Sequence, residues 1–423
     1  MQTNKESVNM SKLKAYVIVF VAVLLLLFVA SFIAQLELPA PTGSYGVGRS
    51  SRVWADNSRI ESIGPRQGDV REVSVEIWYP AKAGTGIVSP YFPEFSGLAK
   101  SLAASGEVSR IQVFLLRFVR SHEKIDAVFA EDTQPHPVIL LSPGNGTNVD
   151  FYSGIADELA SHGFVVVGIN HPYDVAATTL LDGSIAQFDP GPFEFQAHEA
   201  WVRGRIQVRT EDVLFVLAQL EAMNKGEDVQ FAGQLDLSRV GIMGHSLGGI
   251  TAAQACAKDI RFRACINFDG LQKGGPFSAT EDITPPSQPF MLITKEEEIA
   301  PALAAVFTEI EGGSYRVIIR NARHDNFTDG PPLLPSLLPT SNHADHILVL
   351  IRTYTLAFFD QTLRANPSML LRDPFESTDV RLEVYAPRQV TYGNEISVKI
   401  RPSILRSPIL CHNKITAQDE LSF

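Results

Sequence analysis

The hydrophobic residues of this chain fall into one long apolar stretch near the N-terminus and a series of short apolar runs further on. The short runs do not alternate apolar with polar positions, and they are bounded by glycine, proline or charged residues. Such runs are typical of strands that are buried on both faces of a parallel sheet. They predict strands at residues 73–80, 136–144, 163–172, 239–246, 263–270, 289–296 and 315–324.

Helical patterns occupy most of the gaps between these runs. They predict helices at about 150–162, 199–224, 247–258, 299–310 and 343–364. Strands that alternate with helices indicate an α/β fold with a mostly parallel central sheet, flanked by helices and joined by right-handed crossovers. Open sheets of this kind bind their ligands at the carboxyl ends of the strands. Chemically active side chains are therefore expected directly after the predicted strands.

The long apolar stretch, residues 15–36, predicts a transmembrane helix. Twenty apolar residues in a helix extend over roughly 30 Å, which matches the hydrocarbon core of a bilayer. Lys5, Lys12 and Lys14 precede the stretch, and the next basic residue is Arg49, so the positive-inside rule places the N-terminus in the cytosol. The alternative is a cleaved signal peptide, which would make the protein secreted.

These patterns suggest five parts of the chain. Residues 1–14 form a cytosolic N-terminus, and a linker rich in proline and glycine follows the membrane segment at 37–48. Residues 49–365 are expected to form the catalytic domain. Residues 366–423 are an extension to which the sequence assigns no role.

The 423-residue chain has a formal net charge of −11, which argues against a nucleic-acid partner because phosphates require a basic surface. Its three cysteines have no metal-site spacing, and no other residues predict a metal or a cofactor. Cys256 and Cys265 lie in apolar surroundings and are interpreted as small core residues. A single disulfide remains the alternative.

The strongest motif is Gly244-His245-Ser246-Leu247-Gly248, which follows a predicted strand and opens a predicted helix. This is the context of a nucleophile elbow, in which serine occupies a sharp turn and its neighbours two positions away must be small. The helix that follows would direct its first amides toward a developing negative charge. The alternative is a glycine-rich packing turn with an idle serine.

A serine nucleophile needs a histidine base, and His324 is the candidate because it directly follows a predicted strand. His343 and His346 lie three residues apart, but without further ligands they indicate a helix surface rather than a metal site. His412 lies in a tail without a pattern.

The carboxylate that orients this base is expected at Asp269, after the strand that follows the elbow. Asp325 is adjacent to His324 and would diverge from its ring on an extended backbone. Asp329 stands beside Gly330 and Pro331, where turn formation explains it.

Backbone amides should complete the site as an oxyanion hole. We expect one donor at Leu247, directly after the serine, and nominate Asn145 in "LSPGNGTN" for the other. A plain turn between strand and helix is the alternative reading of that loop.

With these motifs in order, the chain from about Pro41 to Asp360 resembles the plasma-type platelet-activating-factor acetylhydrolases and their bacterial relatives. The resemblance rests on "PTGSYGVG", "EIWYPA", "LSPGNG", "YSGIADELASHGFVVVGINHPYD", "GHSLGG", "NFDG" and "HDNFTD". It implies an α/β-hydrolase without metal or calcium, which cleaves short or oxidised sn-2 acyl groups of phospholipids. Ser246 would be the nucleophile, His324 the base and Asp269 the acid, with Asn145 and Leu247 at the oxyanion positions.

One departure from the family affects the substrate more than the chemistry. Pro143 stands where the family has a histidine, and Asn145 replaces an apolar residue. A general carboxylesterase or polyester hydrolase, and an inactive binding domain held at the membrane, therefore remain alternatives. The apolar residues 111–119 fit either a buried helix or a surface that contacts lipid.

Overall fold

A twelve-stranded sheet forms the centre of the computed structural model, which describes residues 4–33, 36–105, 109–132, 134–192, 195–271, 285–296, 307–333, 341–388, 390–392 and 396–398. Its strand order is β13-β14-β12-β11-β10-β9-β5-β6-β2-β1-β4-β3. The strands of this sheet are β1 (Gly46–Ile60), β2 (Val70–Ala81), β3 (Ile87–Val88), β4 (Glu123–Ile125), β5 (His136–Ser142), β6 (Val165–Asn170), β9 (Leu235–His245), β10 (Phe262–Phe268), β11 (Phe290–Lys295), β12 (Ser314–Ile319), β13 (Phe375–Glu376) and β14 (Val380–Tyr385). Two short hairpins, β7 (Ala177–Thr179) with β8 (Ile185–Gln187) and β15 (Val390–Tyr392) with β16 (Ile396–Val398), lie outside it.

The middle of the sheet is parallel, as the apolar runs predict. β6, β5, β9, β10, β11 and β12 pair in parallel in this order, and the seven predicted strands fall on these six and on β2. β2 joins β6 in the antiparallel sense, and β14 does the same on β12. The α/β prediction with a mostly parallel sheet is therefore confirmed.

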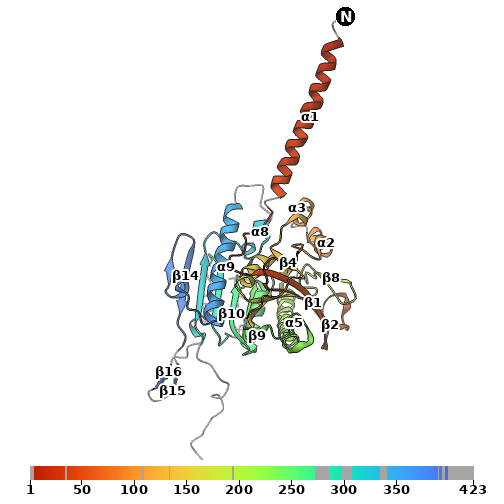
Figure 1. Cartoon of the computed structure of the whole chain (residues 1–423). Helices are drawn as coiled ribbons and strands as arrows, with labels where there is room; N and C mark the ends of the chain where they lie inside the picture. Colours follow the sequence, from red (N-terminus) through yellow and green to blue (C-terminus); the bar gives the residue numbers. More distant parts are fainter. Residues whose placement is uncertain are drawn as a thin grey trace, which may run out of the picture.

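Helices cover both faces of the parallel strands (Figure 1). The residues of β5 explain why: Ile139 and Leu141 join a hydrophobic cluster with α4 and α9, whereas Val138 and Leu140 join another with α5 and α6. A strand buried on both sides in this way must be apolar at every position. The helices are α1 (Asn4–Ile33), α2 (Phe95–Ser105), α3 (Arg110–Leu115), α4 (Ser153–Ser161), α5 (Phe195–Ala222), α6 (Leu247–Lys258), α8 (Gly330–Leu333) and α9 (Ser341–Leu363). The helix predicted at 299–310 lies largely outside the described residues.

Two segments predicted as peripheral are packed on the body. In the predicted linker, Leu38 is buried and the carbonyls of Pro39 and Ala40 accept hydrogen bonds from Arg352 of α9. In the predicted C-terminal extension, β14 pairs along the whole of β12. The sheet therefore continues past residue 365, because an exposed edge at β12 would leave its backbone groups unpaired.

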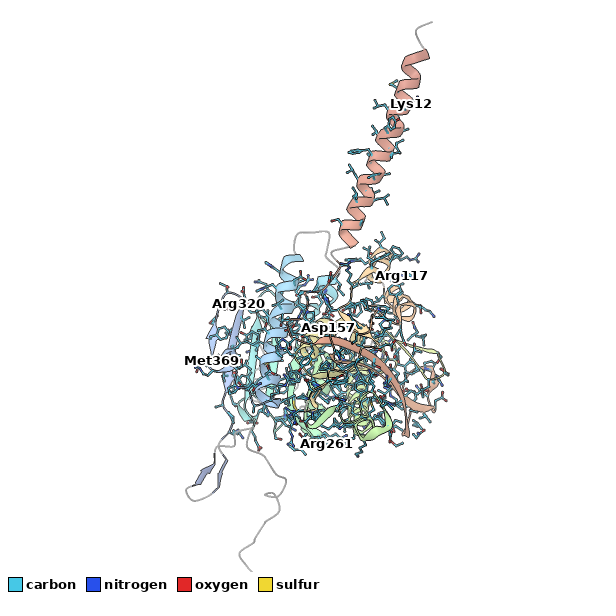
Figure 2. All side chains as sticks on the ribbon, in the orientation of Figure 1. Lys12, Arg117, Asp157, Arg261, Arg320 and Met369 are labelled. Carbon is cyan, nitrogen blue, oxygen red and sulfur yellow. A yellow bond between two sulfur atoms is a disulfide. The ribbon has the colours of Figure 1, made fainter. Side chains whose placement is uncertain are left out.

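The N-terminal stretch forms α1, a single helix that projects away from the body (Figure 1). Figure 2 labels Lys12 near the far end of α1, and Arg117 on the body close to where this helix leaves it. Among the described residues, no helix combines the length and the apolarity that crossing a bilayer requires. The prediction of a transmembrane helix is therefore not supported, and polar residues up to Lys14 take up the first part of α1.

Residues 111–119 form a short amphipathic element, α3 followed by η2 (Leu116–Phe118). Val113 and Leu116 are buried against the body, whereas Ile111 and Phe114 are 73% and 54% exposed. One side of the apolar run is therefore core and the other is exposed surface, and its contact with lipid stays a prediction.

Cys256 in α6 and Cys265 in β10 form a disulfide, where the sequence favoured two unpaired core residues. The two elements are in direct contact, and this proximity is a tertiary property that cysteine spacing does not reveal. The disulfide joins the helix that follows Ser246 to the strand that precedes Asp269.

Candidate active site

Ser246 occupies a sharp turn between β9 and α6, as the elbow motif predicts. Its backbone adopts φ 55° and ψ −121°, a conformation that costs a residue with a side chain about 1–3 kcal/mol. Its amide donates to the carbonyl of Phe268 in β10 at 2.9 Å. A Cβ atom at Gly244 would overlap the carbonyl of Gly248, and one at Gly248 would overlap that of Ser142. Only glycine at both positions lets α6 begin this close to the ends of β9 and β5.

Asp269 and His324 are brought together from 55 residues apart. The Nδ1 of His324 lies 2.7 Å from Oδ2 of Asp269, and the other oxygen of Asp269 accepts from the hydroxyl of Thr294 at 2.6 Å. Burial raises the pKa of Asp269, but the hydrogen bonds from His324 and Thr294 outweigh it, so that the net pKa lies below its ordinary value. The carboxylate is therefore ionised and oriented to accept the Nδ1 proton.

Asp325 does not share this arrangement. Its carboxylate is exposed and lies 3.1 Å from the guanidinium of Arg323. His324 and Asp325 lie in a 3-10 helix, η6 (His324–Phe327), and not on the extended backbone that was expected. The imidazole takes its partner from the residue that follows β10.

The loop after β5 is fixed by hydrogen bonds on both sides of Asn145. The carbonyl of Pro143 accepts from buried Arg209 at 2.8 Å. The amide of Gly144 donates to the Tyr152 hydroxyl at 2.9 Å, and the amide of Gly146 donates to the carbonyl of Asp174 at 2.8 Å.

The amide of Asn145 is the exception in this loop. Within the part of the chain that the structure describes, it has no hydrogen-bond partner. Leu247 begins α6, and the first amides of a helix have no intrahelical acceptor. The two nominated donors thus have no acceptor within the described residues, and the end of β5 at Ser142 lies against the start of α6 at Gly248.

His245, the residue before Ser246, is buried between two other parts of the site. Its Nδ1 lies 2.9 Å from the Tyr152 hydroxyl, and its Nε2 lies 3.1 Å from the carbonyl of His324. The rings of His245 and His324 have centroids 4.6 Å apart. These contacts place His324 beside the elbow.

A second Ser-His-Asp group, which sequence reasoning missed, lies deeper in the molecule. The Oγ of Ser142 is 3.0 Å from Nε2 of His171, whose Nδ1 is 2.9 Å from Asp212. All three residues are 0% exposed, and burial lowers the pKa of His171 to about 4. Arg71 and Arg59 also pair with Asp212. No substrate can reach this group, which instead ties the end of β5 to β6 and α5.

Asp329 is a buried residue that fixes the loop after β12, which contains His324, and it is not a turn residue on the surface. It is 0% exposed, and its Oδ2 accepts from the Tyr91 hydroxyl at 2.5 Å and from the Gly154 amide at 2.9 Å. Its own amide donates to the carbonyl of Phe151. The spacing of Asp329 beside Gly330 and Pro331 indicates a turn, but nothing local in the sequence indicates that this turn is buried against α4.

This burial predicts a pH-dependent cost at Asp329. Burial raises its pKa to about 7, and the hydrogen bonds from Tyr91 and Gly154 offset only part of that effect. Between the unfolded pKa of about 4 and the folded value, only the unfolded carboxyl ionises, so the folded state loses stability as the pH rises. We expect Asp329→Asn to gain in unfolding free energy relative to wild type from pH 4 to 7, by at most about 4 kcal/mol, and then level off.

Urea unfolding at a series of pH values measures this difference. Asp325→Asn, an exposed substitution in the same loop, serves as the control and should show no such trend. A difference between Asp329→Asn and wild type that is equal at pH 5 and pH 8 would contradict the prediction. Asp157, Glu123 and Arg352, which also act on Asp329 electrostatically, are unchanged in both proteins.

Within the described ranges, no group of three or more His, Cys, Asp or Glu side chains is arranged to hold an ion. His346 pairs with Asp379 at 3.4 Å on the surface, as a helix-surface residue would.

Known proteins with similar sequences and folds point to ester hydrolysis. A family model described as "Platelet-activating factor acetylhydrolase, isoform II" matches residues 30–343. The platelet-activating factor acetylhydrolase of Cavia porcellus is 28% identical over 249 residues, covering 52% of this chain and 55% of the relative. The chain thus spans about half the length of that protein. A probable 1-alkyl-2-acetylglycerophosphocholine esterase of Arthroderma benhamiae is 26% identical over 374 residues, covering 80% and 91%.

A solved structure agrees with the sequence relatives. A ferulic acid esterase from Streptomyces cinnamoneus superimposes with a TM-score of 0.61 at 26% identity, over 81% of this chain and 97% of the esterase. The resemblance inferred from the motifs is confirmed by the family model, which covers most of the chain. This chain belongs to the platelet-activating factor acetylhydrolase, isoform II, family.

Proposed function

We propose that this protein is a serine esterase that cleaves short or oxidised sn-2 acyl groups from phospholipids such as platelet-activating factor. The observation that carries the proposal is the 2.7 Å contact between His324 and Asp269 beside the strained Ser246. The buried Ser142 group has similar contacts but no access to solvent. The His324 side chain is 40% exposed, so a substrate can reach it.

In the acylation step, Ser246 attacks the carbonyl carbon of the ester. The Nδ1–H of His324 is committed to Asp269, so its Nε2 is the nitrogen that takes the serine proton. The carbonyl oxygen becomes negatively charged in the tetrahedral intermediate. The amides of Asn145 and Leu247 donate hydrogen bonds to that oxygen. Such donors stabilise the negatively charged oxygen more than the neutral carbonyl, so they favour the tetrahedral intermediate.

The leaving alcohol departs when the ester C–O bond breaks and His324 returns the proton to the alcohol oxygen. A water molecule then attacks the acyl-serine, with His324 again taking a proton. Collapse of the second tetrahedral intermediate releases the acid and restores the Ser246 hydroxyl. Every proton moves through one imidazole, and no metal is needed.

Covalent labelling tests the nucleophile directly. A fluorophosphonate probe should attach to the full-length protein in detergent, and peptide mass spectrometry should locate the adduct on Ser246. Heat-unfolded protein is the control, because an elbow that no longer folds cannot activate its serine. Absence of labelling would favour the third interpretation, an inactive binding domain.

A chain-length series tests the substrate class. We expect kcat/KM to fall at least tenfold between acetyl and hexadecanoyl at the sn-2 position of 1-alkyl phosphocholines, because a site for short acyl groups must bend or exclude the longer chain. p-Nitrophenyl esters with the same acyl groups form the parallel series without a head group. Equal or better turnover of these simple esters would favour the general carboxylesterase, an alternative to which the ferulic acid esterase structure also points.

We also propose that the catalytic domain lies outside the cytoplasm and contacts a membrane through α1. Two observations support this: disulfides such as Cys256–Cys265 persist in oxidising compartments, and apolar side chains from Val17 to Leu27 are exposed along α1. Carbonate extraction of cell membranes should retain the full chain and release a variant that lacks residues 1–33. Equal release of both would contradict membrane contact through this helix.

A further inference from the structure

Three hydrogen bonds link the two halves of the site through side chains outside the triad. The Gly144 amide lies 2.9 Å from the Tyr152 hydroxyl, which lies 2.9 Å from Nδ1 of His245. Nε2 of His245 lies 3.1 Å from the carbonyl oxygen of His324. This chain of contacts, which we name the Tyr152–His245 relay, begins one residue before Asn145 and ends on the residue that carries the base.

Only one arrangement of protons satisfies all three contacts. The carbonyl of His324 can only accept, so Nε2 of His245 carries the hydrogen and Nδ1 has the lone pair. The Tyr152 hydroxyl then donates to Nδ1 and accepts from the Gly144 amide. The ring must be neutral for this, and burial together with the nearby His324 lowers the pKa of His245 to about 3. The relay therefore keeps a single direction across the working pH range.

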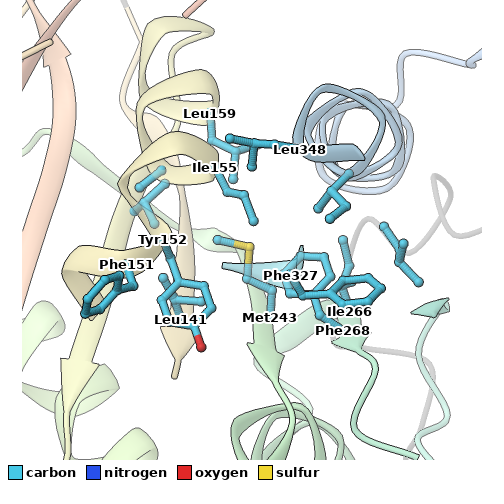
Figure 3. Close-up of a cluster of buried hydrophobic side chains, with 14 of the residues drawn as sticks. Leu141, Phe151, Tyr152, Ile155, Leu159, Met243, Ile266, Phe268, Phe327 and Leu348 are labelled. Carbon is cyan, nitrogen blue, oxygen red and sulfur yellow. The ribbon is translucent and has the colours of Figure 1, made fainter. Parts of the chain in front are cut away.

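Close packing surrounds these groups, and the Thr147 side chain also hydrogen-bonds to the Tyr152 hydroxyl. The Tyr152 ring is 0% exposed and belongs to the hydrophobic cluster that contains Leu141, Met243 and Phe327, where Figure 3 shows it between α4 and the sheet. A Cβ atom on Gly144 would lie 3.0 Å from Nδ1 of His245 and 3.3 Å from the Tyr152 hydroxyl, so the loop fits tightly over both. Loss of the Tyr152 hydroxyl would leave a backbone donor and a ring acceptor unpaired in a dry environment.

We propose that Tyr152 and His245 are positioning residues, which hold the Asn145 amide and the His324 imidazole in one fixed geometry around Ser246. The inference rests on the proposed function. It adds the requirement that Tyr152 and His245 fix the geometry in which Ser246, His324 and Asp269 act. The oxyanion loop follows β5, the base follows β12, and the two strands are separated by β9, β10 and β11 in the sheet. Because strand pairing sets their relative position only coarsely, side chains must supply the last fraction of an ångström that catalysis needs.

Tyr152→Phe tests the relay with the smallest change. We expect kcat to fall about 10- to 100-fold, as for loss of an oxyanion donor or slightly less, with KM within about twofold. The affinity for a short-chain trifluoromethyl ketone, whose adduct with Ser246 carries a negative oxygen, should fall in parallel with kcat. If Tyr152 had a purely structural role, the substitution would lower the melting temperature but would not lower kcat selectively at a nearly unchanged KM.

Tyr79→Phe is the matched control. Tyr79 is also buried, and its hydroxyl donates to the carbonyl of Ala127 at 2.8 Å, away from the site. Both variants lose one buried hydroxyl, so their melting temperatures should fall by similar amounts. Only Tyr152→Phe should lose turnover and inhibitor affinity.

Two substitutions of His245 separate the ends of the relay. Glutamine can still donate to the His324 carbonyl but cannot accept from the Tyr152 hydroxyl. Asparagine can accept from the Tyr152 hydroxyl but does not reach the His324 carbonyl. Both should lower kcat, and Tyr152→Phe should lower it less in the His245→Gln background than in wild type, because only the bond to the Gly144 amide is then left to lose. These variants also keep the inference testable if Tyr152→Phe folds poorly.

The outcomes distinguish the relay from the esterase itself. If wild type hydrolyses esters and Tyr152→Phe keeps kcat within twofold, or loses it together with a proportional rise in KM, the relay is overturned. If wild type neither hydrolyses esters nor reacts with the fluorophosphonate, the proposed function fails instead.

Discussion

Ser246→Ala is expected to lower kcat for acetyl esters by about 10⁵-fold, with little change in KM. The substitution removes the atom that forms the acyl-enzyme and leaves the amides of Asn145 and Leu247 in place. What remains should be the slow attack of water that an oxyanion hole still supports. Initial rates on p-nitrophenyl acetate, measured at high enzyme concentration, cover this range.

Ser142→Ala provides a control with the same chemical change in the other Ser-His-Asp group. Ser142 contacts His171 through its hydroxyl, but both are wholly buried, so no ester can be attacked there. We expect the melting temperature to fall, since the His171 nitrogen loses its partner in a dry interior, while kcat stays within tenfold of wild type. The reverse ranking of the two variants would mean that the wrong group has been assigned to catalysis.

The parts of this structure that the sequence predicts are those that local physics determines. β5, residues 240–245 of β9 and residues 264–268 of β10 are buried on both faces, so each forms a short run that can be recognised without knowledge of its neighbours. The elbow is equally local, since the strained turn at Ser246 and the closeness of Gly244 to Gly248 require small residues at fixed spacing. The choice of Asp269 over Asp325 followed from how adjacent side chains diverge.

The parts that escaped prediction depend on contacts between distant segments. Asp329 bonds to Gly154 of α4 and to Phe151 of the 3-10 turn that precedes it (η3, Val149–Tyr152), and no pattern within residues 321–330 reveals these contacts. Cys256 and Cys265 pair because α6 packs on β10.

The role of Tyr152 was missed for a different reason. It lies inside a motif that supported the family resemblance, yet its hydroxyl has a role only once His245 and Gly144 are placed around it. Sequence reasoning thus nominated the groups that we propose to react and missed most of the residues packed around them.

Asp269→Asn is expected to lower kcat by about 10⁴-fold while leaving the fold intact. One oxygen of Asp269 accepts from Nδ1 of His324 and the other from the Thr294 hydroxyl. An asparagine in this place can satisfy the threonine with its oxygen only by turning its NH₂ group toward Nδ1. The imidazole would then carry its proton on Nε2, the nitrogen that must accept from Ser246. The loss should therefore appear in kcat, with an unchanged KM and a melting temperature close to that of wild type.

Asp325→Asn tests whether the acid has been assigned to the correct neighbour of His324. Asp325 is next to the base in sequence but points to solvent, where it pairs with Arg323, so its loss should change kcat by less than twofold.

The pH profile adds a second criterion. Because the hydrogen bonds at Asp269 hold its pKa below the ordinary value, the carboxylate of wild type is ionised at neutral pH. Raising the pH to neutrality should restore no activity to Asp269→Asn, since the defect is a proton on the wrong ring nitrogen and not a protonated carboxyl. A variant at position 325 that lost activity as severely as the one at position 269 would contradict the assignment of the acid to the end of β10.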